Sequence, residues 1–236
     1  MIFLQKDIRK VYIMNLLLVG LGVLIILLIY ILYVYFTSQE STLTKEGNLK
    51  TGLPYVTSID SPTNTRYAYG IWIYVNTWDP NVEKTIFKRE NSLHVYLDQT
   101  APILKCSMKM SDDTEEEIIV TDNFPLQKWT CVIVSVDNQF MDVYMDGKLV
   151  KSQRFFKPES SVMPKTPNDS DPIMFGNFDA YIKDFKRWTE PMDPQTAWNE
   201  YLKGSEHDNI LKSLSSYGID VSVFRNNELQ NTFSVF

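Results

Sequence analysis

The sequence has few of the side chains that catalysis and metal binding usually require. Only two histidines, His94 and His207, occur among its 236 residues, and they lie far apart in the chain. No grouping of cysteine, histidine and aspartate has the spacing of a zinc site. A G-x-S-x-G nucleophile elbow and a glycine-rich phosphate loop are also absent from the sequence. These absences favour a binding or structural protein over an enzyme, and they predict no metal and no other cofactor.

Cysteine is equally scarce, with Cys106 and Cys131 the only residues of this type. Two cysteines cannot form the dense disulfide framework of a small secreted domain. Both occur in predicted strands, so they either pair in an oxidising compartment or stay as two buried free thiols, which is the commoner situation. The one N-glycosylation sequon, at Asn168, lies in a proline-rich loop and is a candidate modification site.

Basic residues are also in short supply. The chain has 23 Lys and Arg against 29 Asp and Glu, a formal net charge of −6. Residues 1–50 contain five basic and three acidic side chains, so the remainder, with 18 basic and 26 acidic side chains, has a net charge of −8. A nucleic-acid-binding protein needs a basic footprint, which this composition does not provide. The same charge disfavours adsorption of the larger part of the chain onto anionic lipid.

One stretch lacks charge altogether. Residues 11–36 read VYIMNLLLVGLGVLIILLIYILYVYF, with Asn15 as the one strongly polar side chain. A helix rises about 1.5 Å per residue, so roughly 20 apolar residues cross a bilayer core about 30 Å thick. We therefore expect residues 11–36 to form a transmembrane helix. A helix buried in a protein core is disfavoured, because the rest of the chain shows almost no helices that could cover it.

The flanks of this stretch favour a retained signal anchor. The apolar run exceeds the roughly 7–15 residues of a cleaved signal peptide, and no small-x-small cleavage site follows it. Residues 1–10 carry Lys6, Arg9 and Lys10 against Asp7, whereas the charges that follow the stretch cancel. By the positive-inside rule the N-terminus is cytosolic, and the bulk of the chain lies across the membrane. The sequence thus divides into a basic flank (1–10), a transmembrane helix (11–36), a stalk (37–64) and a folded domain (65–236).

The folded domain is rich in short strand patterns. Residues 67–78 (YAYGIWIYVNTW) carry aromatic and β-branched side chains at both parities, which predicts a strand buried on both faces. Residues 111–117 are strongly charged and predict a hairpin loop ahead of a strand at 118–121. Residues 129–155 predict a three-stranded meander whose last turn is Asp146-Gly147, a sequence typical of type I′ turns.

Only one helix is predicted in this domain. Asp193 can cap it, Pro194 suits its first turn, and Gly204 can end it. Residues 217–224 and 229–235 then predict a closing hairpin. Many short strands with regular turn signals and almost no helix predict an all-β fold, an antiparallel sandwich or jelly roll with one short helix.

Three segments occur in an order that resembles a known family. They are GIWIYV at 70–75, KWTCVIV at 128–134 with VYMDGKLV at 143–150, and a last stretch from 175 to 204 that contains YIKDFKRW and YLKG. This order is similar to that of the laminin-G-like branch of the concanavalin A-like lectin/glucanase jelly rolls, and it covers roughly residues 66–204. The resemblance implies two facing antiparallel sheets. It does not fix a function, because that fold serves lectins, glycosidases, adhesion modules and structural proteins.

Glycosidases of this fold need two carboxylates that flank the scissile bond, and in the laminarinase-like enzymes these occur as E-x-D-x-x-E on one strand. The sequence contains no such pattern. Glu115 and Glu117 could share a strand face, but they belong to the predicted solvated loop, so we expect a non-enzymatic protein. Some laminin-G domains bind calcium through loop carboxylates, although solvation is the simpler explanation for those found here. The candidates by composition alone are Asp112, Asp113, Asp169 and Asp171.

The first functional hypothesis is a structural tether. The helix would hold the chain in a membrane while the jelly roll docks onto a protein layer. This architecture also resembles membrane-anchored minor capsid proteins of large icosahedral DNA viruses with an inner membrane, which implies lipid and capsid-protein partners in a virion. The orientation given by the basic flank conflicts with that role, because a domain that meets a capsid assembled in the cytosol should face the cytosol.

The alternative hypothesis is a membrane-anchored, lectin-like module that binds a glycan at the cell surface or in a lumenal compartment. Such a module needs an exposed aromatic ring on which a sugar can stack. Trp78, Tyr96 and Tyr144 are the candidate ligand-binding residues. We interpret Trp72 and Trp129 instead as core residues of the fold.

Overall fold

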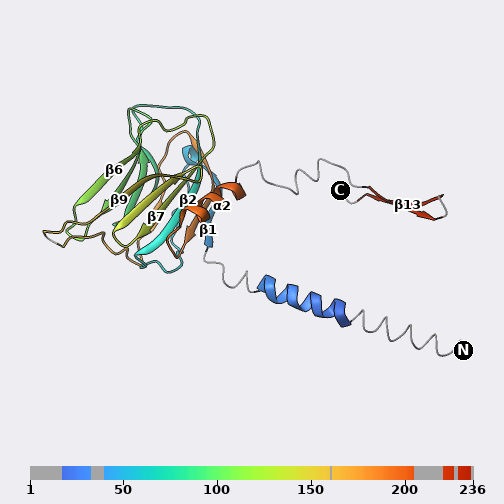
Figure 1. Ribbon diagram of the computed structural model, residues 1–236. Helices are drawn as coiled ribbons and strands as arrows, with labels where there is room; N and C mark the ends of the chain where they lie inside the picture. Colours follow the sequence, from blue (N-terminus) through green and yellow to red (C-terminus); the bar gives the residue numbers. More distant parts are fainter. Residues whose placement is uncertain (1–17, 33–39, 160, 205–219, 226–227, 235–236) are drawn as a thin grey trace, which may run out of the picture. The chain divides into compact units, whose positions relative to one another are not determined.

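The chain divides into two compact units, residues 1–39 and residues 40–236. In the computed structural model, the described part of the first unit is a helix, and the second unit contains the β-structure (Figure 1). The residues that the structure describes are 18–32, 40–159, 161–204, 220–225 and 228–234.

The helix of the first unit covers residues 18–32. Its side chains carry no charge, and Leu21, Leu24 and Ile26 are 56%, 61% and 69% exposed. No helix within the described residues is both long and apolar enough to cross a membrane. The predicted transmembrane segment also includes residues 11–17 and 33–36, which lie outside the described residues.

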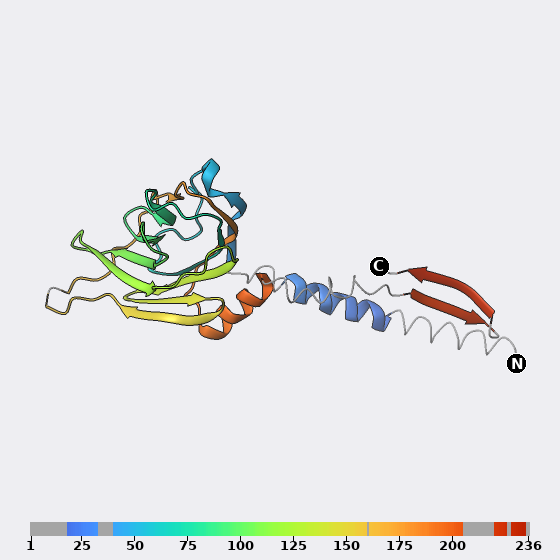
Figure 2. The ribbon, with the colours of Figure 1, turned by 90° about the horizontal axis from the view of Figure 1, so that it is seen from above.

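Two antiparallel sheets form a sandwich in the second unit (Figures 1 and 2). One has six strands in the order β1-β11-β2-β7-β8-β9, and the other has five in the order β10-β3-β4-β5-β6. The six-stranded sheet consists of β1 (Glu40–Asn48), β2 (Arg66–Val75), β7 (Thr130–Asp137), β8 (Phe140–Met145), β9 (Lys148–Arg154) and β11 (Ala180–Trp188). The five-stranded sheet consists of β3 (Lys84–Arg89), β4 (Leu93–Leu97), β5 (Leu104–Lys109), β6 (Glu115–Thr121) and β10 (Ile173–Met174). The predicted all-β antiparallel sandwich is confirmed.

The main hydrophobic core lies between the two sheets. Strand β2 contributes Ile71 and Ile73 to this core, and β4 contributes Val95 from the opposite sheet. Because side chains alternate along a strand, Ala68 and Trp72 point to the other face of β2, where a second, smaller cluster lies. Strand β2 is therefore buried on both faces, as its composition predicted.

Helix α2 (Pro194–Gly204) covers the second cluster on the outer face of the six-stranded sheet. Its N-terminus is capped by Asp193, whose Oδ1 accepts hydrogen bonds from the backbone N–H groups of Gln195 and Thr196 at 2.9 and 3.1 Å. Ala197, which is fully buried, packs into the cluster. The predicted helix and its cap are both confirmed.

The turn between β8 and β9 allows α2 to approach the sheet closely. Asp146 and Gly147 have φ angles of +47° and +74°, as the predicted type I′ turn requires. A Cβ atom on Gly147 would lie 2.8 Å from a ring carbon of Trp198 and 3.0 Å from Cβ of Tyr201. Glycine at this position therefore allows both the positive φ of the turn and the close approach of α2.

The predicted stalk is wrong over residues 40–48. These residues form β1, which pairs antiparallel with β11 at one edge of the six-stranded sheet. An edge strand is paired on one side only, and the side chains of β1 are all exposed or half-buried, so its sequence resembles a polar linker. A short 3-10 helix, η1 (Leu49–Thr51), follows and buries Leu49.

The loop predicted at residues 111–117 also needs correction. Glu115 is the first residue of β6, which pairs with β5 through Lys109–Glu115 and Ser107–Glu117. Like β1, β6 is an edge strand, and its exposed positions carry the charges that suggested a loop.

A separate two-stranded antiparallel sheet is formed by β12 (Asp220–Arg225) and β13 (Glu228–Ser234). It confirms the predicted closing hairpin, with its ends shifted by a few residues. Residues 217–219 and 235 of that prediction lie outside the described residues.

Candidate functional site

Tyr144, one of the three predicted ligand-binding residues, does not expose its ring to solvent. Its side chain is 1% exposed, and its hydroxyl donates a hydrogen bond to the backbone carbonyl of Met192 at 3.1 Å. Burial raises the pKa of this phenol to about 12. Tyr144 lies on the outward side of β8, but the segment that leads into α2 covers it, so the expectation of a stacking surface there is corrected.

Trp78 follows β2 and is half-buried against the main core. The Lys84 ammonium lies 4.3 Å from the centroid of a Trp78 ring and occupies one of its faces. Lys84 is itself fixed by three backbone carbonyls, those of Asp79, Val82 and Gln99, at 2.5 to 2.9 Å. The indole is therefore part of a buried cation site, and one of its faces is covered by Lys84.

Tyr96 lies on the outer face of the five-stranded sheet. Its ring stacks on His94 with 4.3 Å between the ring centroids, and its hydroxyl donates a hydrogen bond to Glu117. Glu117 also pairs with Lys105 at 3.1 Å. The three predicted ligand-binding residues thus lie in three separate parts of the sandwich and do not form one site.

The cysteines lie in different hydrophobic clusters. Cys106 belongs to the core between the sheets, whereas Cys131 belongs to the cluster beneath α2. Both are free, buried thiols, and burial raises the pKa of each. The structure therefore favours the second of the two situations left open by the sequence.

The sequon residue Asn168 is exposed, but its backbone is held in place. Its N–H donates to the Asp171 carboxylate at 3.1 Å, and its carbonyl accepts from buried Arg89 at 3.0 Å. Elsewhere, Asp112 and Asp113 form ion pairs with lysines. Among the described residues, no three Cys, His, Asp or Glu side chains converge as a metal site would require.

A groove of about 460 Å³ lies on the outer face of the six-stranded sheet, over β1 and β11 and beside Trp129, the residue before β7. We call it the aromatic groove. Its lining residues are Glu46, Gly47, Asn48, Trp129, Tyr181, Ile182 and Lys183.

An aromatic strip runs along this groove, in which Trp129 and Tyr181 line the groove and Tyr74 packs between these two rings. Tyr181 on β11 pairs across the sheet with Tyr74 on β2, and their ring centroids are 6.5 Å apart. The Tyr74 and Trp129 centroids are separated by 5.7 Å. Tyr181 is 41% exposed, and Trp129 is half-buried. The strip thus offers ring surface to a ligand while its lower part is fixed by packing.

Lys183 lies beside this strip. Its side chain points outward from β11, opposite Trp72 on β2 and Glu46 on β1. The ammonium lies 4.9 Å from the centroid of Trp129 and 5.2 Å from that of Trp72. The groove therefore combines an aromatic surface with a cation and, through Glu46, an anion.

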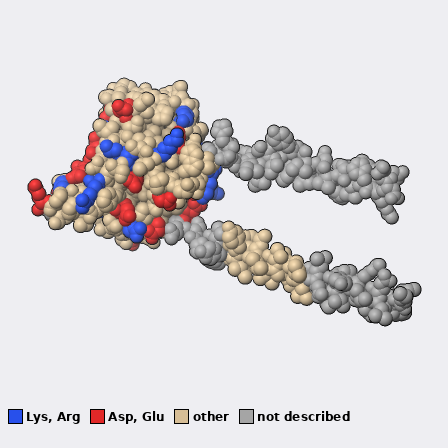
Figure 3. Space-filling model, viewed as in Figure 1, with Lys and Arg blue, Asp and Glu red and all other residues tan. Residues whose placement is uncertain are grey.

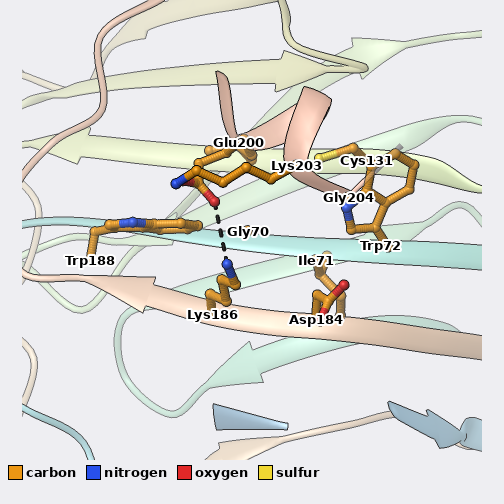
Figure 4. A pocket seen from close by; sticks show the side chains of 11 residues that line it. Gly70, Ile71, Trp72, Cys131, Asp184, Lys186, Trp188, Glu200, Lys203 and Gly204 are labelled. Atoms are coloured by element: carbon orange, nitrogen blue, oxygen red, sulfur yellow. Dashed lines mark hydrogen bonds and ion pairs between the residues drawn. The ribbon is translucent and has the colours of Figure 1, made fainter. Parts of the chain in front are cut away.

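A second, smaller cavity of about 180 Å³ lies further along β11, under the end of α2. Figure 4 shows Lys186 pointing to Glu200 across it, at 3.4 Å. Glu200 is 8% exposed and also pairs with Lys203, so its buried charge is compensated. These contacts fix α2 on the sheet beside the aromatic groove.

The sequence matches a laminin G-type family, described as the Concanavalin A-like lectin/glucanases superfamily, over residues 50–197. The chain belongs to this superfamily. The resemblance seen in the three sequence segments is thereby confirmed. Among curated proteins, no sequence match is found.

Solved structures with a similar fold include the botulinum neurotoxin serotype D ligand binding domain in complex with N-acetylneuraminic acid. It has a TM-score of 0.53 and 15% identity over 70% of this chain and 43% of that chain. The receptor binding domain of botulinum neurotoxin D has a TM-score of 0.51 and 15% identity, with 68% and 44% covered. The chain thus spans less than half of the length of these structures, which at this identity support the concanavalin A-like fold alone.

Sequence reasoning missed the residues of the aromatic groove. Trp129 was interpreted as a core residue, and Tyr181 and Lys183 were noted only as part of the family's closing motif. The alternation Tyr181-x-Lys183 places both side chains on one strand face, which is visible in the sequence. Their position beside Tyr74 and Trp129 depends on the strand order β11-β2-β7, which the sequence does not contain.

Proposed function

We propose that the protein is a carbohydrate-binding module of the concanavalin A-like superfamily that binds a glycan in the aromatic groove. The observation that carries this proposal is the strip of Trp129, Tyr74 and Tyr181 beside polar groups in an open groove. One face of a pyranose ring is rich in C–H groups and packs on aromatic rings, while its hydroxyls need hydrogen-bond partners at the edge.

The polar groups of the groove suit such a ligand. Glu46 provides carboxylate acceptors. The Asn48 side-chain oxygen, Oδ1, accepts a hydrogen bond from the backbone N–H of Lys50 at 3.0 Å, which fixes the side chain and leaves its NH2 group to donate. The volume of about 460 Å³ is within the range of roughly 300–1,000 Å³ typical of ligand sites.

The positions of Glu115 and Glu117, the two carboxylates that could share a strand face, also favour a non-enzymatic role. Glu115 accepts a hydrogen bond from the Ser107 hydroxyl, and Glu117 is held by Tyr96 and Lys105. Both lie on the five-stranded sheet, away from the aromatic groove. A glycosidase needs two carboxylates on either side of the bond that it cleaves, and the groove lining contains one.

The test is a glycan array probed with the full chain, kept soluble in detergent, and with two matched variants. Tyr181→Ala removes an exposed ring from the groove, whereas Tyr55→Ala removes another exposed ring, 63% exposed, that does not line it. We expect the original chain and Tyr55→Ala to bind the same glycans, and Tyr181→Ala to lose about tenfold or more in affinity. An array with no bound glycan, from folded protein, would overturn the proposal.

Membrane attachment is the second part of the proposal. Residues 11–36 contain no charged side chain, and the described helix at 18–32 is apolar on every face. We place the basic flank, and with it the N-terminus, in the cytosol. The carbohydrate-binding module then lies on the far side of the membrane, at the cell surface or in a lumenal compartment.

The same apolar helix favours one alternative function, a tether between a membrane and a protein layer. A minor capsid protein that links a virion's inner membrane to its capsid is the form of tether that the sequence suggested. This alternative needs a stable protein partner and no glycan. Co-purification of the chain with a protein assembly, together with a blank glycan array, would favour the tether over the carbohydrate-binding module.

A further inference from the structure

We infer that the aromatic groove selects a pyranose bearing a single carboxylate, and that Lys183 binds this carboxylate. The inference rests on the proposed carbohydrate-binding function and extends it to the class of sugar.

Lys183 is held in a defined position at the groove. Its ammonium lies 4.9 and 5.2 Å from the ring centroids of Trp129 and Trp72. A cation beside two indole rings is stabilised by their negative π-faces and exchanges part of its hydration for them. The side chain is half-buried, so it does not extend freely into solvent as a surface lysine would. The position of the charge is therefore fixed before a ligand arrives.

The hydrogen-bonding capacity of this ammonium is left unused. Among the described residues, Lys183 forms no ion pair, although Glu46 lies directly opposite it on β1. Lys186 lies three residues further along β11, beyond an irregularity in the pairing with β2 that returns it to the same outer face. It differs from Lys183 because it pairs with Glu200 and with Glu40. Indole rings accept no conventional hydrogen bond from an ammonium, so its three N–H donors remain available to a ligand carboxylate.

The other charged side chains in and around the groove favour a ligand with only one acidic group. Glu46 lies in the same groove and would repel a second anion close to the first. On the face of the sandwich seen in Figure 3, Lys and Arg are interspersed with Asp and Glu, so that face offers no basic patch for a polyanion. A cationic ligand is disfavoured by Lys183 itself. A monocarboxylated pyranose, with its ring on Tyr181 and its carboxylate at Lys183, satisfies each of these constraints.

The experiment compares two sugars that differ only in the carboxylate, methyl β-D-glucuronide, which has it, and methyl β-D-glucoside, which does not. Each is titrated into the full chain in detergent, and binding is followed by NMR. We expect the glucuronide to bind about tenfold more tightly, as a charge-assisted hydrogen bond provides. Lys183→Met should reduce the ratio of the two affinities to about one, and Lys183→Arg should retain most of it. Lys148→Met, at the opposite edge strand β9, is the control that removes a charge outside the groove.

The outcomes separate this inference from the function on which it rests. Equal affinity for the two sugars, with loss of both in Tyr181→Ala, overturns the role of Lys183 and keeps the carbohydrate-binding function. A preference for the glucuronide that survives in Lys183→Met also overturns it. If neither sugar binds and the glycan array is blank, both proposals fail. Equal thermal unfolding midpoints for the variants exclude a folding defect as the cause of lost binding.

Discussion

Three cationic side chains, Lys84, Arg89 and Arg187, are at most 1% exposed, yet none of them pairs with a carboxylate within the described residues. Each of them instead donates hydrogen bonds to backbone carbonyl oxygens. Arg187 donates to the carbonyls of Asp60 and Ser61, and its guanidinium lies 5.8 Å from the ring centroid of Tyr67. Each buried cation thus fixes a loop to the end of a strand, and removing it would leave carbonyls without partners.

Arg187→Met should lower the free energy of unfolding by about 2 kcal/mol, because the carbonyls of Asp60 and Ser61 lose a charged, buried donor. The matched control is Arg66→Met. Arg66 pairs with Asp137 and Glu190 at the surface, with about half of its side chain exposed, so its loss should cost less than about 1 kcal/mol. Urea unfolding followed by tryptophan fluorescence measures both. Equal losses would contradict the role given to the buried cation.

Tyr67 gives a prediction about alkaline pH. Burial, and secondarily the neighbouring Tyr69, raises the pKa of Tyr67 to about 12 from an ordinary value of 10.0. The unfolded chain therefore releases this proton first, so the stabilisation is complete below pH 10 and is lost as the pH rises towards 12. A shift of two units corresponds to about 2–3 kcal/mol.

Tyr67→Phe should make the fall in stability between pH 10 and 12 shallower than in the original chain. Tyr144 and the two buried thiols also have raised pKa values, so part of the fall remains in this variant. Urea midpoints measured at several pH values give the two slopes. Identical slopes would show that Tyr67 ionises as easily in the folded chain as in the unfolded one.

At the level of single elements, α2 depends on its cap. Asp193 accepts hydrogen bonds from Gln195, and from both the backbone and the hydroxyl of Thr196, and these bonds lower its pKa. Asp193→Ala should lower stability by about 1 kcal/mol, whereas Gln195→Ala, on the same turn, should cost less than half of that. Thermal unfolding of the two variants provides the comparison, and an equal effect would mean that the cap is not a stabilising feature.

The elements that the sequence predicted well are those with strong local signals. The Asp146-Gly147 turn and the Asp193-Pro194 helix start depend on residues a few positions apart, and both are found as predicted. The edge strand β1 and the first three residues of edge strand β6 were missed because such strands bury little and carry charge. The aromatic groove was missed for another reason, since Tyr181, Tyr74 and Trp129 come together only through the strand order.

At the scale of the whole molecule, the chain contains a wholly apolar helix and a concanavalin A-like sandwich. We expect the expressed chain to remain with membranes after an alkaline carbonate wash. Leu24→Arg combined with Leu28→Arg should release it, because each arginine near a bilayer centre costs about 2.5–3.5 kcal/mol. The matched control, Leu24→Ala with Leu28→Ala, should stay bound. Release of the original chain by the wash would contradict membrane attachment.

The side of the membrane on which the sandwich lies is a separate prediction. With the N-terminus in the cytosol, the sandwich should resist added protease in sealed vesicles that keep the cytosolic face outward, and should be cleaved once detergent opens them. Cleavage in intact vesicles would place the sandwich in the cytosol. That result would remove the conflict between the orientation and the capsid tether.

The binding of a sugar in the aromatic groove can be observed directly through the tryptophans. The five indoles lie in different environments. Trp129 lines the groove and Trp72 lies beside Lys183, whereas Trp78 is under Lys84, Trp188 lines the smaller cavity and Trp198 is on α2. The measurement is the change in each indole N–H resonance of the full chain, in detergent, during titration with methyl β-D-glucuronide. We predict that the Trp129 signal moves most and that those of Trp78 and Trp198 stay in place. Saturable changes confined to Trp78 or Trp198, or no change at any indole, would contradict a carbohydrate site in the groove.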